Sequence, residues 1–89
     1  MKIEYDPIKS ENNRLERGLS FELAAEFELD TAIIRMDVHQ QYGEPRFNAR
    51  GFILDRLYHL TFTIRADVIR VISFRKANKR EVNYYVHNH

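Results

Sequence analysis

Two periodicities divide the chain: a helical spacing of apolar residues comes first, and a two-residue alternation follows from Thr31 onward. Asp6 and Pro7 provide an N-cap followed by proline at the first helical position, which predicts a helix start. Gly18 suits the left-handed end of that helix, and Ser20 can cap a second one. The expected elements are a short strand over residues 2–5, a helix over 7–17 and a second, amphipathic helix over 21–27.

Beyond Thr31 the composition turns β-branched and apolar residues alternate with polar ones, which predicts strands. Turn residues around Gly43 and at Asp55 separate these strands. The alternation places Arg46 and Arg50 on one face of the second strand. The pattern predicts an α+β fold, in which two N-terminal helices pack on a four-stranded or five-stranded antiparallel sheet closed by a C-terminal helix. The expected elements are strands over residues 31–39 and 46–54, a third strand with Tyr58, Leu60, Phe62 and Ile64 facing the core, a fourth over 68–75, and a helix over 77–85.

A chain of 89 residues has room for one hydrophobic core, so residues 1–89 are predicted to form a single domain. Its hydrophobic content of 44% exceeds that of disordered proteins. The absence of cysteine excludes disulfides, thiolate catalysis and cysteine-based zinc sites. No apolar run approaches the roughly 20 residues of a membrane span, and the N-terminus lacks the apolar region of a signal peptide. The protein is therefore expected to be soluble, cytoplasmic and without a membrane partner.

The formal net charge of +1 conceals a strong division of charge along the sequence. Residues 1–45 contain five Lys or Arg and ten Asp or Glu, whereas residues 46–89 contain nine Lys or Arg and three Asp or Glu. A polyanion such as RNA is attracted to a basic surface of this kind. The C-terminal half is therefore the predicted nucleic-acid-binding part of the chain.

Arginine suits phosphate because its planar guanidinium offers several donors and stays charged at any relevant pH. Arg46 on one predicted strand, with Arg70 and Arg75 on another, are the candidate catalytic residues, which together can stabilise a charged transition state. Strict alternation puts Arg70 and Arg75 on opposite faces, although twist at the strand end, or an early exit into the last helix, would swing Arg75 and Lys76 back to the side of Arg70. An isolated strand arginine is more often a solvated or salt-bridged surface group.

Histidine is a candidate proton-transfer residue because it titrates near neutral pH. His59 is expected in mid-strand with partial exposure, while Tyr84 and Tyr85 in the closing helix are more often packing residues. No Walker loop, dinucleotide fingerprint, nucleophile elbow or zinc spacing is present in the sequence, so neither a cofactor nor a metal site is predicted. The remaining histidines are His39, His87 and His89.

Several short motifs, spread over nearly the whole chain, together resemble the BrnT family. The most specific is the segment from Arg70 to Ala77, in combination with the Asp-Pro and Gly-x-Ser-Phe elements near the N-terminus. The matching positions are Tyr5-Asp6-Pro7-x-Lys9, Asn13, Arg17-Gly18-Leu-Ser20-Phe21-Glu22-x-Ala24, Glu44-x-Arg46-Phe47, Gly51, Arg70-Val-Ile-Ser73-x-Arg75-Lys76-Ala77, Arg80-Glu81 and Tyr84.

The resemblance implies a ribonuclease toxin of a bacterial type II toxin-antitoxin pair, with a fold similar to the RelE toxins. Such a toxin cuts RNA without a metal or cofactor, because basic side chains bind the scissile phosphate while a ribose 2′-hydroxyl attacks it. The implied partner is a BrnA-type antitoxin with a ribbon-helix-helix DNA-binding region. The implied phosphate contacts are Arg46, Arg70 and Arg75, and the RNA-binding residues expected around them are Lys9, Arg50, Lys76, Lys79 and Arg80.

The sequence departs from the family pattern in three places. Arg17 stands where a histidine is common, Pro45 replaces the glutamate of a Glu-Arg pair, and Phe74 replaces a small residue. If that histidine or glutamate moves protons in relatives, then His39, Tyr84 or solvent has to do so here. The alternative function is a catalytically weakened module that binds RNA or scaffolds the antitoxin, and a third is a structural protein with a solvated basic face.

Overall fold

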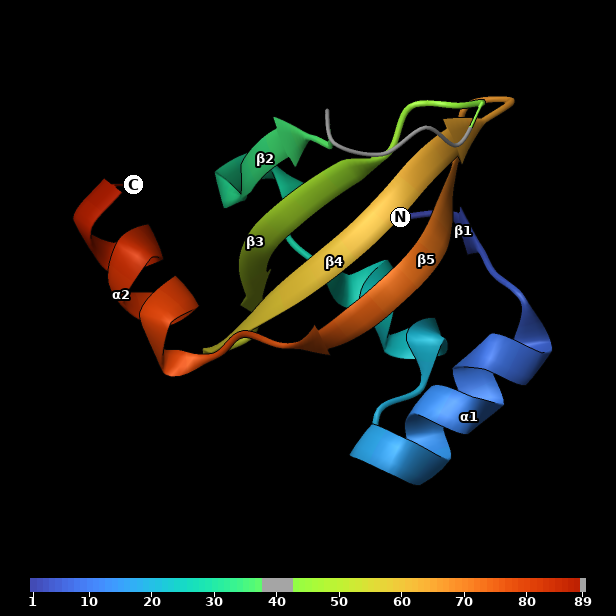
Figure 1. Cartoon of the computed structure of the whole chain (residues 1–89), viewed down its shortest axis with the longest axis horizontal. Helices are drawn as coiled ribbons and strands as arrows, with labels where there is room; N and C mark the ends of the chain where they lie inside the picture. The colour runs from blue at the N-terminus through green and yellow to red at the C-terminus, as the bar shows by residue number, and fades with distance from the viewer. Residues whose placement is uncertain (38–42, 89) are drawn as a thin grey trace.

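The computed structural model describes residues 1–37 and 43–88 of the chain. It is an α+β fold with a five-stranded sheet in the order β1-β5-β4-β3-β2. One helix and two short 3-10 helices follow β1, and a second helix ends the chain (Figure 1). The elements are β1 (Ile3–Glu4), α1 (Pro7–Arg17), η1 (Phe21–Glu26), η2 (Leu29–Thr31), β2 (Ile33–Met36), β3 (Phe47–Ile53), β4 (Arg56–Arg65), β5 (Val68–Lys76) and α2 (Lys79–Asn88).

Helix α1 begins and ends where the sequence predicts. The Asp6 Oδ1 atom accepts a hydrogen bond from the Ile8 amide at 2.9 Å, and Pro7 is the first helical residue. Gly18 adopts a φ of 69° and its amide donates to the Arg14 carbonyl, which is the left-handed end that glycine favours. The Asn13 side chain donates to the Leu19 and Phe74 carbonyls, so it joins α1 to β5.

The predicted second N-terminal helix is wrong, because residues 21–26 form the 3-10 helix η1 instead. Ser20 does cap it, since its hydroxyl accepts from the Glu22 amide. The segment then ends at once, because Phe27 is extended and the next amide donates to the Phe52 carbonyl of β3 at 3.0 Å. Too few residues separate the cap from this attachment for an α-helix to develop.

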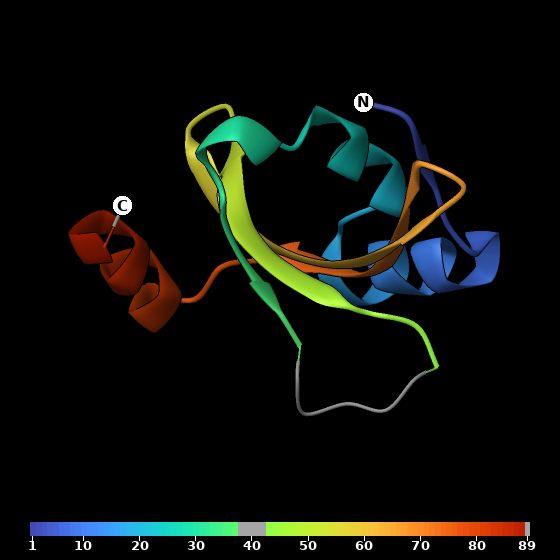
Figure 2. The ribbon, with the colours of Figure 1, turned by 90° about the horizontal axis from the view of Figure 1, so that it is seen from above.

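The main core lies between η1 and one face of the sheet. In Figure 2, η1 covers the concave side of the curved sheet, while α2 projects beyond its end. Phe27 packs so closely that a Cβ atom on Gly51 would lie 2.8 Å from its ring, which explains glycine at that position. The buried core residues are Leu19, Phe21, Ala24, Phe27, Ala49, Ile53, Tyr58, Leu60, Phe62, Val71 and Phe74.

The sheet is mixed rather than wholly antiparallel. The pairs of β2 with β3, β3 with β4 and β4 with β5 are antiparallel as predicted, but β1 pairs with β5 in parallel. After β2, β3 and β4, the chain returns to the edge of the sheet that β1 forms, and β5 runs there in the same direction as β1. Ile64 was expected in the core and is 53% exposed, because it lies at the last pairs of β4, past the residues that η1 covers.

A β-bulge in β5 corrects the expected orientation of the arginines. Thr61 pairs with Ser73, whereas the next residue of β4, Phe62, pairs with Val71, so Ile72 is the extra residue. The bulge changes the alternation, and both Val71 and Phe74 therefore face the core. Arg70 and Arg75 consequently lie on the same outer face, where strict alternation had placed them on opposite faces.

Helix α2 packs against the outer face through a second, smaller core. Asn78 caps it, because its Oδ1 accepts from the Glu81 amide while the Glu81 carboxylate accepts from the Asn78 amide, both at 2.9 Å. The Tyr85 hydroxyl donates to the Thr31 carbonyl at 2.7 Å. This core contains Leu57, Ala77 and Tyr85, with Ile33, Phe52 and Val82 at its margin. Neither α1 nor α2, in the part of the chain that the structure describes, is long and apolar enough to cross a membrane.

Candidate nucleic-acid cleavage site

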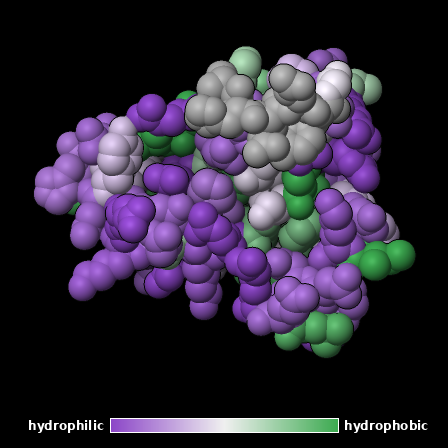
Figure 3. Space-filling view, viewed as in Figure 1, coloured by the Kyte–Doolittle hydropathy of each residue, from purple (hydrophilic) through white to green (hydrophobic). Residues whose placement is uncertain are grey.

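The outer face of the sheet carries an ordered array of polar side chains. Arg50, His59 and Arg75 pair across β3, β4 and β5, and Asn48, Thr61 and Ser73 form the next row. A further row toward the other end of the face contains Thr63 and Arg70. Figure 3 views this side of the molecule and shows mainly hydrophilic side chains on it.

At the α2 end of the face, cationic side chains surround Glu81, which is only 6% exposed. Arg75 forms a bidentate pair with its carboxylate, with Nη1 and Nη2 at 2.8 and 2.9 Å from the two oxygens. The Arg50 Nη2 atom lies 3.2 Å from the Glu81 Oε2 atom, and the Nδ1 atom of His59 lies 3.7 Å from the same oxygen. Glu81 therefore fixes the positions of two arginines contributed by separate strands.

The pKa values of the two acid-base groups follow from this arrangement. Hydrogen bonds from Arg75 lower the pKa of Glu81 to about 2, so Glu81 is a carboxylate at neutral pH. Burial, followed by the charge of Arg75, lowers the pKa of His59 to about 4. His59 is therefore neutral at pH 7, and its Nδ1 atom accepts a hydrogen bond from Arg50 Nε at 3.3 Å.

The depressed pKa of His59 predicts a loss of stability on mild acidification. The unfolded chain binds a proton on His59 near pH 6.5, but the folded chain does so only near pH 4. The free energy of unfolding is therefore expected to fall by up to about 3 kcal/mol as the pH is lowered from 6.5 to about 4. Below pH 4 His59 is protonated in both states and causes no further loss. Urea unfolding at a series of pH values measures the slope, and His59→Gln should remove it. An identical slope in both proteins would contradict the assignment.

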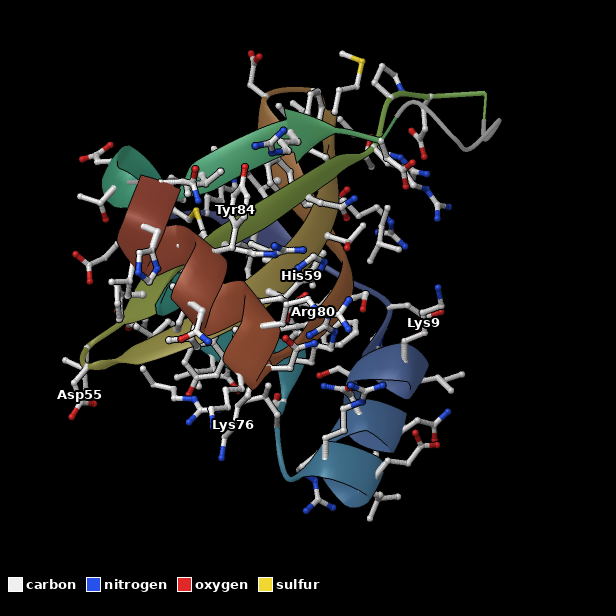
Figure 4. All side chains as sticks on the ribbon, turned by 60° about the vertical axis from the view of Figure 1, so that its left-hand side comes forward. Lys9, Asp55, His59, Lys76, Arg80 and Tyr84 are labelled. Atoms are coloured by element: carbon white, nitrogen blue, oxygen red, sulfur yellow. The ribbon has the colours of Figure 1, made fainter. Side chains whose placement is uncertain are left out.

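A groove of about 780 Å³ opens beside this cluster, between α2 and the strands β2, β3 and β4. Tyr84 points from α2 toward the sheet, where His59 points toward α2 (Figure 4). Arg35 of β2 donates a hydrogen bond to the Tyr84 hydroxyl, and its guanidinium lies 5.6 Å from the centre of the ring. The groove is lined by Ile33, Arg35, Met36, Asp37, Asn48, Arg50, His59 and Tyr84.

A second, smaller pocket of about 190 Å³ lies at the other end of the outer face. Arg46 and Arg70 both line it, together with Lys9 from α1. The structure thus brings Arg46 and Arg70 to one place and Arg75 to another. Arg70 and Arg75 are five residues apart on a strand with one bulged residue, which corresponds to roughly 13 Å.

The other predicted RNA-binding residues divide between the groove and its margin. Arg50 lies in the cluster around Glu81, while Lys76, Lys79 and Arg80 are exposed at the end of β5 and the start of α2. In Figure 4 Lys76 points away from His59 and Tyr84. His87 is exposed near the end of α2 and contacts the Asn83 carbonyl there. His39 and His89 lie outside the described residues.

Two residues of the site were not expected from the sequence. Glu81 organises the cluster, and Arg35 holds Tyr84, although neither had been chosen as a site residue. The spacing Asn78-x-x-Glu81 is a capping box, which could have indicated that Glu81 turns back toward the start of α2. The sequence holds no comparable signal for Arg35, because its partner lies 49 positions away.

The comparison with protein families decides to which family this chain belongs. The family model described as the ribonuclease toxin BrnT of type II toxin-antitoxin systems matches residues 5–81. The chain belongs to this family. The match begins directly after β1 and ends in the first turn of α2, so it includes the strands β2 to β5. Searches of curated proteins and of solved structures gave no match. A BrnT-family chain is a ribonuclease toxin, and its type of system includes a protein antitoxin.

Proposed function

We propose that this BrnT-family chain is a metal-independent endoribonuclease that cleaves RNA by attack of a ribose 2′-hydroxyl on the adjacent phosphate. The cleavage centre is the cluster of Arg50, His59 and Arg75 at the edge of the groove below Tyr84. The observation that carries the proposal is the convergence of two guanidinium groups and one neutral imidazole on Glu81, beside an open groove that Arg50 and His59 line. Fixed cations of this kind stabilise the charge that develops on a pentacoordinate phosphorus.

The pairing of Arg75 with Glu81 leaves Arg75 able to bind phosphate. A guanidinium has five N–H groups, and Arg75 uses two for Glu81 and one for the Lys76 carbonyl. Its remaining N–H groups suffice for a phosphate oxygen. Arg50 likewise has donors beyond those directed at His59 and Glu81. Glu81 therefore acts as a positioning residue that holds both arginines beside His59, next to the groove.

Proton transfer is assigned to His59 and Tyr84. The 2′-oxygen forms a bond to phosphorus while the bond from phosphorus to the 5′-oxygen breaks. Neutral His59 accepts the 2′-hydroxyl proton once Arg50 turns from its Nδ1 atom to the phosphate, and the Tyr84 hydroxyl delivers a proton to the departing 5′-oxygen. Solvent then returns the proton from His59 to Tyr84. The products are a 2′,3′-cyclic phosphate and a 5′-hydroxyl.

The proposed partner is the cognate antitoxin, a BrnA-type protein with a ribbon-helix-helix DNA-binding region that covers the toxin. Such a protein is expected to be encoded beside this chain. Its inhibitory segment is expected to compete with RNA, since the groove and the basic outer face are open in the free toxin.

The proposal is tested by the products that the purified chain forms from RNA in EDTA. Cleavage with 2′,3′-cyclic phosphate ends and no dependence on added metal is the expected result. Inducible expression should arrest bacterial growth, and co-expression of the neighbouring reading frame should relieve the arrest. RNA cleavage that stops in EDTA and resumes with a divalent ion would overturn the mechanism.

One observation favours a catalytically weakened module as the second candidate function. A proton acceptor with a pKa of about 4 is a weaker base than one near neutrality. This alternative predicts salt-sensitive binding of RNA without any product, and no growth arrest with or without the neighbouring gene.

A further inference from the structure

We propose that the groove between α2 and the strands β2, β3 and β4 is a nucleobase subsite that selects guanine next to the bond that is cut. This inference rests on the proposed function and deepens it, because it adds a base preference to the cleavage of RNA. Arg35 and Asn48 read the edge of the base, and Tyr84 forms the wall against which the base stacks.

The two reading residues lie side by side in the row next to the cleavage centre. Arg35 of β2 pairs with Asn48 of β3, and the neighbouring pair on the same face of these strands contains Arg50. Two residues along a strand span roughly 7 Å, which is within the reach of one nucleotide. A nucleotide whose phosphate lies at Arg50 can therefore place its base beside Arg35 and Asn48.

The side-chain amide of Asn48 is oriented so that its amino group is available to a ligand. The Thr61 hydroxyl donates to Asn48 Oδ1 at 2.7 Å, and this bond fixes the direction of the amide. The Nδ2 atom of Asn48 donates to no residue in the part of the chain that the structure describes. The side chain is half-buried and lines the groove, so its two N–H groups can meet a base there.

Arg35 and Tyr84 together form one wall of the groove. Arg35 donates to the Tyr84 hydroxyl, and its guanidinium lies 5.6 Å from the centre of the ring. A guanidinium has five N–H groups, so Arg35 keeps donors beyond the one that Tyr84 uses. Unpaired RNA bases stack on aromatic rings and on guanidinium planes. In Figure 4 Tyr84 points from α2 toward the sheet, where its ring bounds the space that a base would enter.

The size and lining of the groove fit a base better than a phosphate alone. Its volume of about 780 Å³ lies within the roughly 300–1,000 Å³ of pockets for small organic ligands. Ile33 and Met36 contribute apolar surface, which a flat heterocycle can cover and a phosphate cannot. Asp37 is the acidic residue of the lining, so the groove contains the guanidinium groups of Arg35 and Arg50 and one carboxylate.

The donors of Arg35 and Asn48 determine which base is selected. Guanine offers two neighbouring acceptors, N7 and O6, on one edge. Adenine and cytosine present an amino group on the corresponding edge, and uracil presents a single acceptor. An amino group directed at the Asn48 amide would leave two donors facing each other without an acceptor. Guanine is therefore the base whose edge matches both side chains.

The experiment measures kcat/KM in EDTA for four RNA oligonucleotides that differ in one base within a uridine background. We expect cleavage next to guanine to be about tenfold more efficient than next to the other bases, because one bidentate contact gives discrimination of this order. Asn48→Asp replaces the donor with an acceptor of the same shape. This variant should lose the preference for guanine and gain relative activity next to cytosine, whose amino group donates to carboxylates.

Asn12→Asp is the matched control, because it makes the same substitution at an exposed position of α1 outside the groove. It should keep the base preference of the parent. A preference for guanine that Asn48→Asp leaves unchanged would remove Asn48 from the subsite. Equal kcat/KM for all four bases in the parent would overturn the subsite itself.

Base analogues identify the edge of guanine that is read. Inosine keeps N7 and O6 but lacks the 2-amino group, so the parent should cleave next to it as efficiently as next to guanosine. The analogue 7-deazaguanosine lacks the N7 acceptor and should lose most of the preference. The reverse order would show that the opposite edge is read and would overturn the assignment to Arg35 and Asn48.

A readout independent of cleavage separates this inference from the proposed function. Binding of the four oligonucleotides as 2′-O-methyl RNA, which lacks the attacking hydroxyl, is measured by fluorescence anisotropy. If the parent cuts no RNA but binds the guanine oligonucleotide most tightly, and Asn48→Asp removes this difference, the proposed function fails and the subsite stands. If the parent cuts RNA and binds all four equally, the subsite fails and the proposed function stands.

Discussion

Replacing Arg75 with alanine is expected to slow RNA cleavage by roughly 10²–10³-fold, because one preorganised donor to the transition state is removed. Arg75 is oriented by two hydrogen bonds to Glu81 and retains further donors for phosphate. The loss should appear in kcat, since the charge that Arg75 meets is largest in the transition state. Single-turnover cleavage of a labelled RNA, with parent and variant at saturating concentration, measures it.

Two further variants give this experiment its control. Arg75→Lys keeps the charge but cannot form the bidentate pair, so it should recover only part of the rate. Arg14→Ala removes a cation from the exposed surface of α1 and should cleave like the parent. A rate for Arg75→Ala within a fewfold of the parent would remove Arg75 from the cleavage centre.

The parts of the fold that depend on local signals could be predicted from the sequence. The bounds of α1 follow from Asp6, Pro7 and Gly18, and the strands follow from alternation, because both signals act within a few residues. The 3-10 form of η1 could not be predicted in this way. It depends on the attachment of the chain to Phe52 directly after Phe27, and these contacts join distant positions.

The candidate site could be predicted only as a set of residue types. The basic half of the chain and its arginines were evident, and Arg50 and Arg75 do lie on the outer face of the sheet, where both pair with Glu81. Their grouping in space could not be predicted from the sequence, because the bulge at Ile72 sets the orientation of Arg70 relative to Arg75. Glu81 also acts across elements, since one carboxylate on α2 gathers side chains from β3, β4 and β5.

The sheet also separates the two kinds of charge that the sequence contains. Several exposed acidic residues of the N-terminal half lie on or beside η1 and η2, on the concave side, while the arginines of β3 and β5 lie on the outer face. An approaching polyanion therefore meets a more favourable potential on the outer face than on the concave side. These acidic residues are Glu22, Glu26, Glu28 and Asp30.

Substituting Glu81 with glutamine is the second change with a large expected effect, because it removes the carboxylate around which the cleavage centre is organised. The amide keeps the size of the side chain but leaves Arg50 and Arg75 without their neutralising charge. Removing one partner of a buried pair costs about 3–5 kcal/mol. Both arginine side chains are about 30% exposed and stay partly solvated, so we expect a loss of about 2 kcal/mol at neutral pH. Urea unfolding measures this loss.

The loss of stability at low pH provides a second test of the ion pairs that Glu81 forms with Arg50 and Arg75. The pKa of Glu81 is lowered from 4.5 to about 2, so its contribution is present above pH 4.5 and is lost as the pH falls toward 2. Glu81→Gln should therefore flatten the curve in this window, whereas His59→Gln should flatten it between about pH 6.5 and 4. Glu11→Gln, which breaks an exposed pair with Arg14, is the matched control and should change stability far less.

The rate of RNA cleavage by Glu81→Gln shows whether Glu81 positions the two arginines or blocks the phosphate site. If Glu81 positions the arginines, Glu81→Gln lowers kcat, while RNA affinity is retained or increased because one negative charge has been removed from the cluster of Arg50, His59 and Arg75. If Glu81 instead blocks the phosphate site, the variant cleaves faster than the parent. A faster variant would overturn the positioning role, because the guanidinium groups would then be most effective when the carboxylate does not hold them.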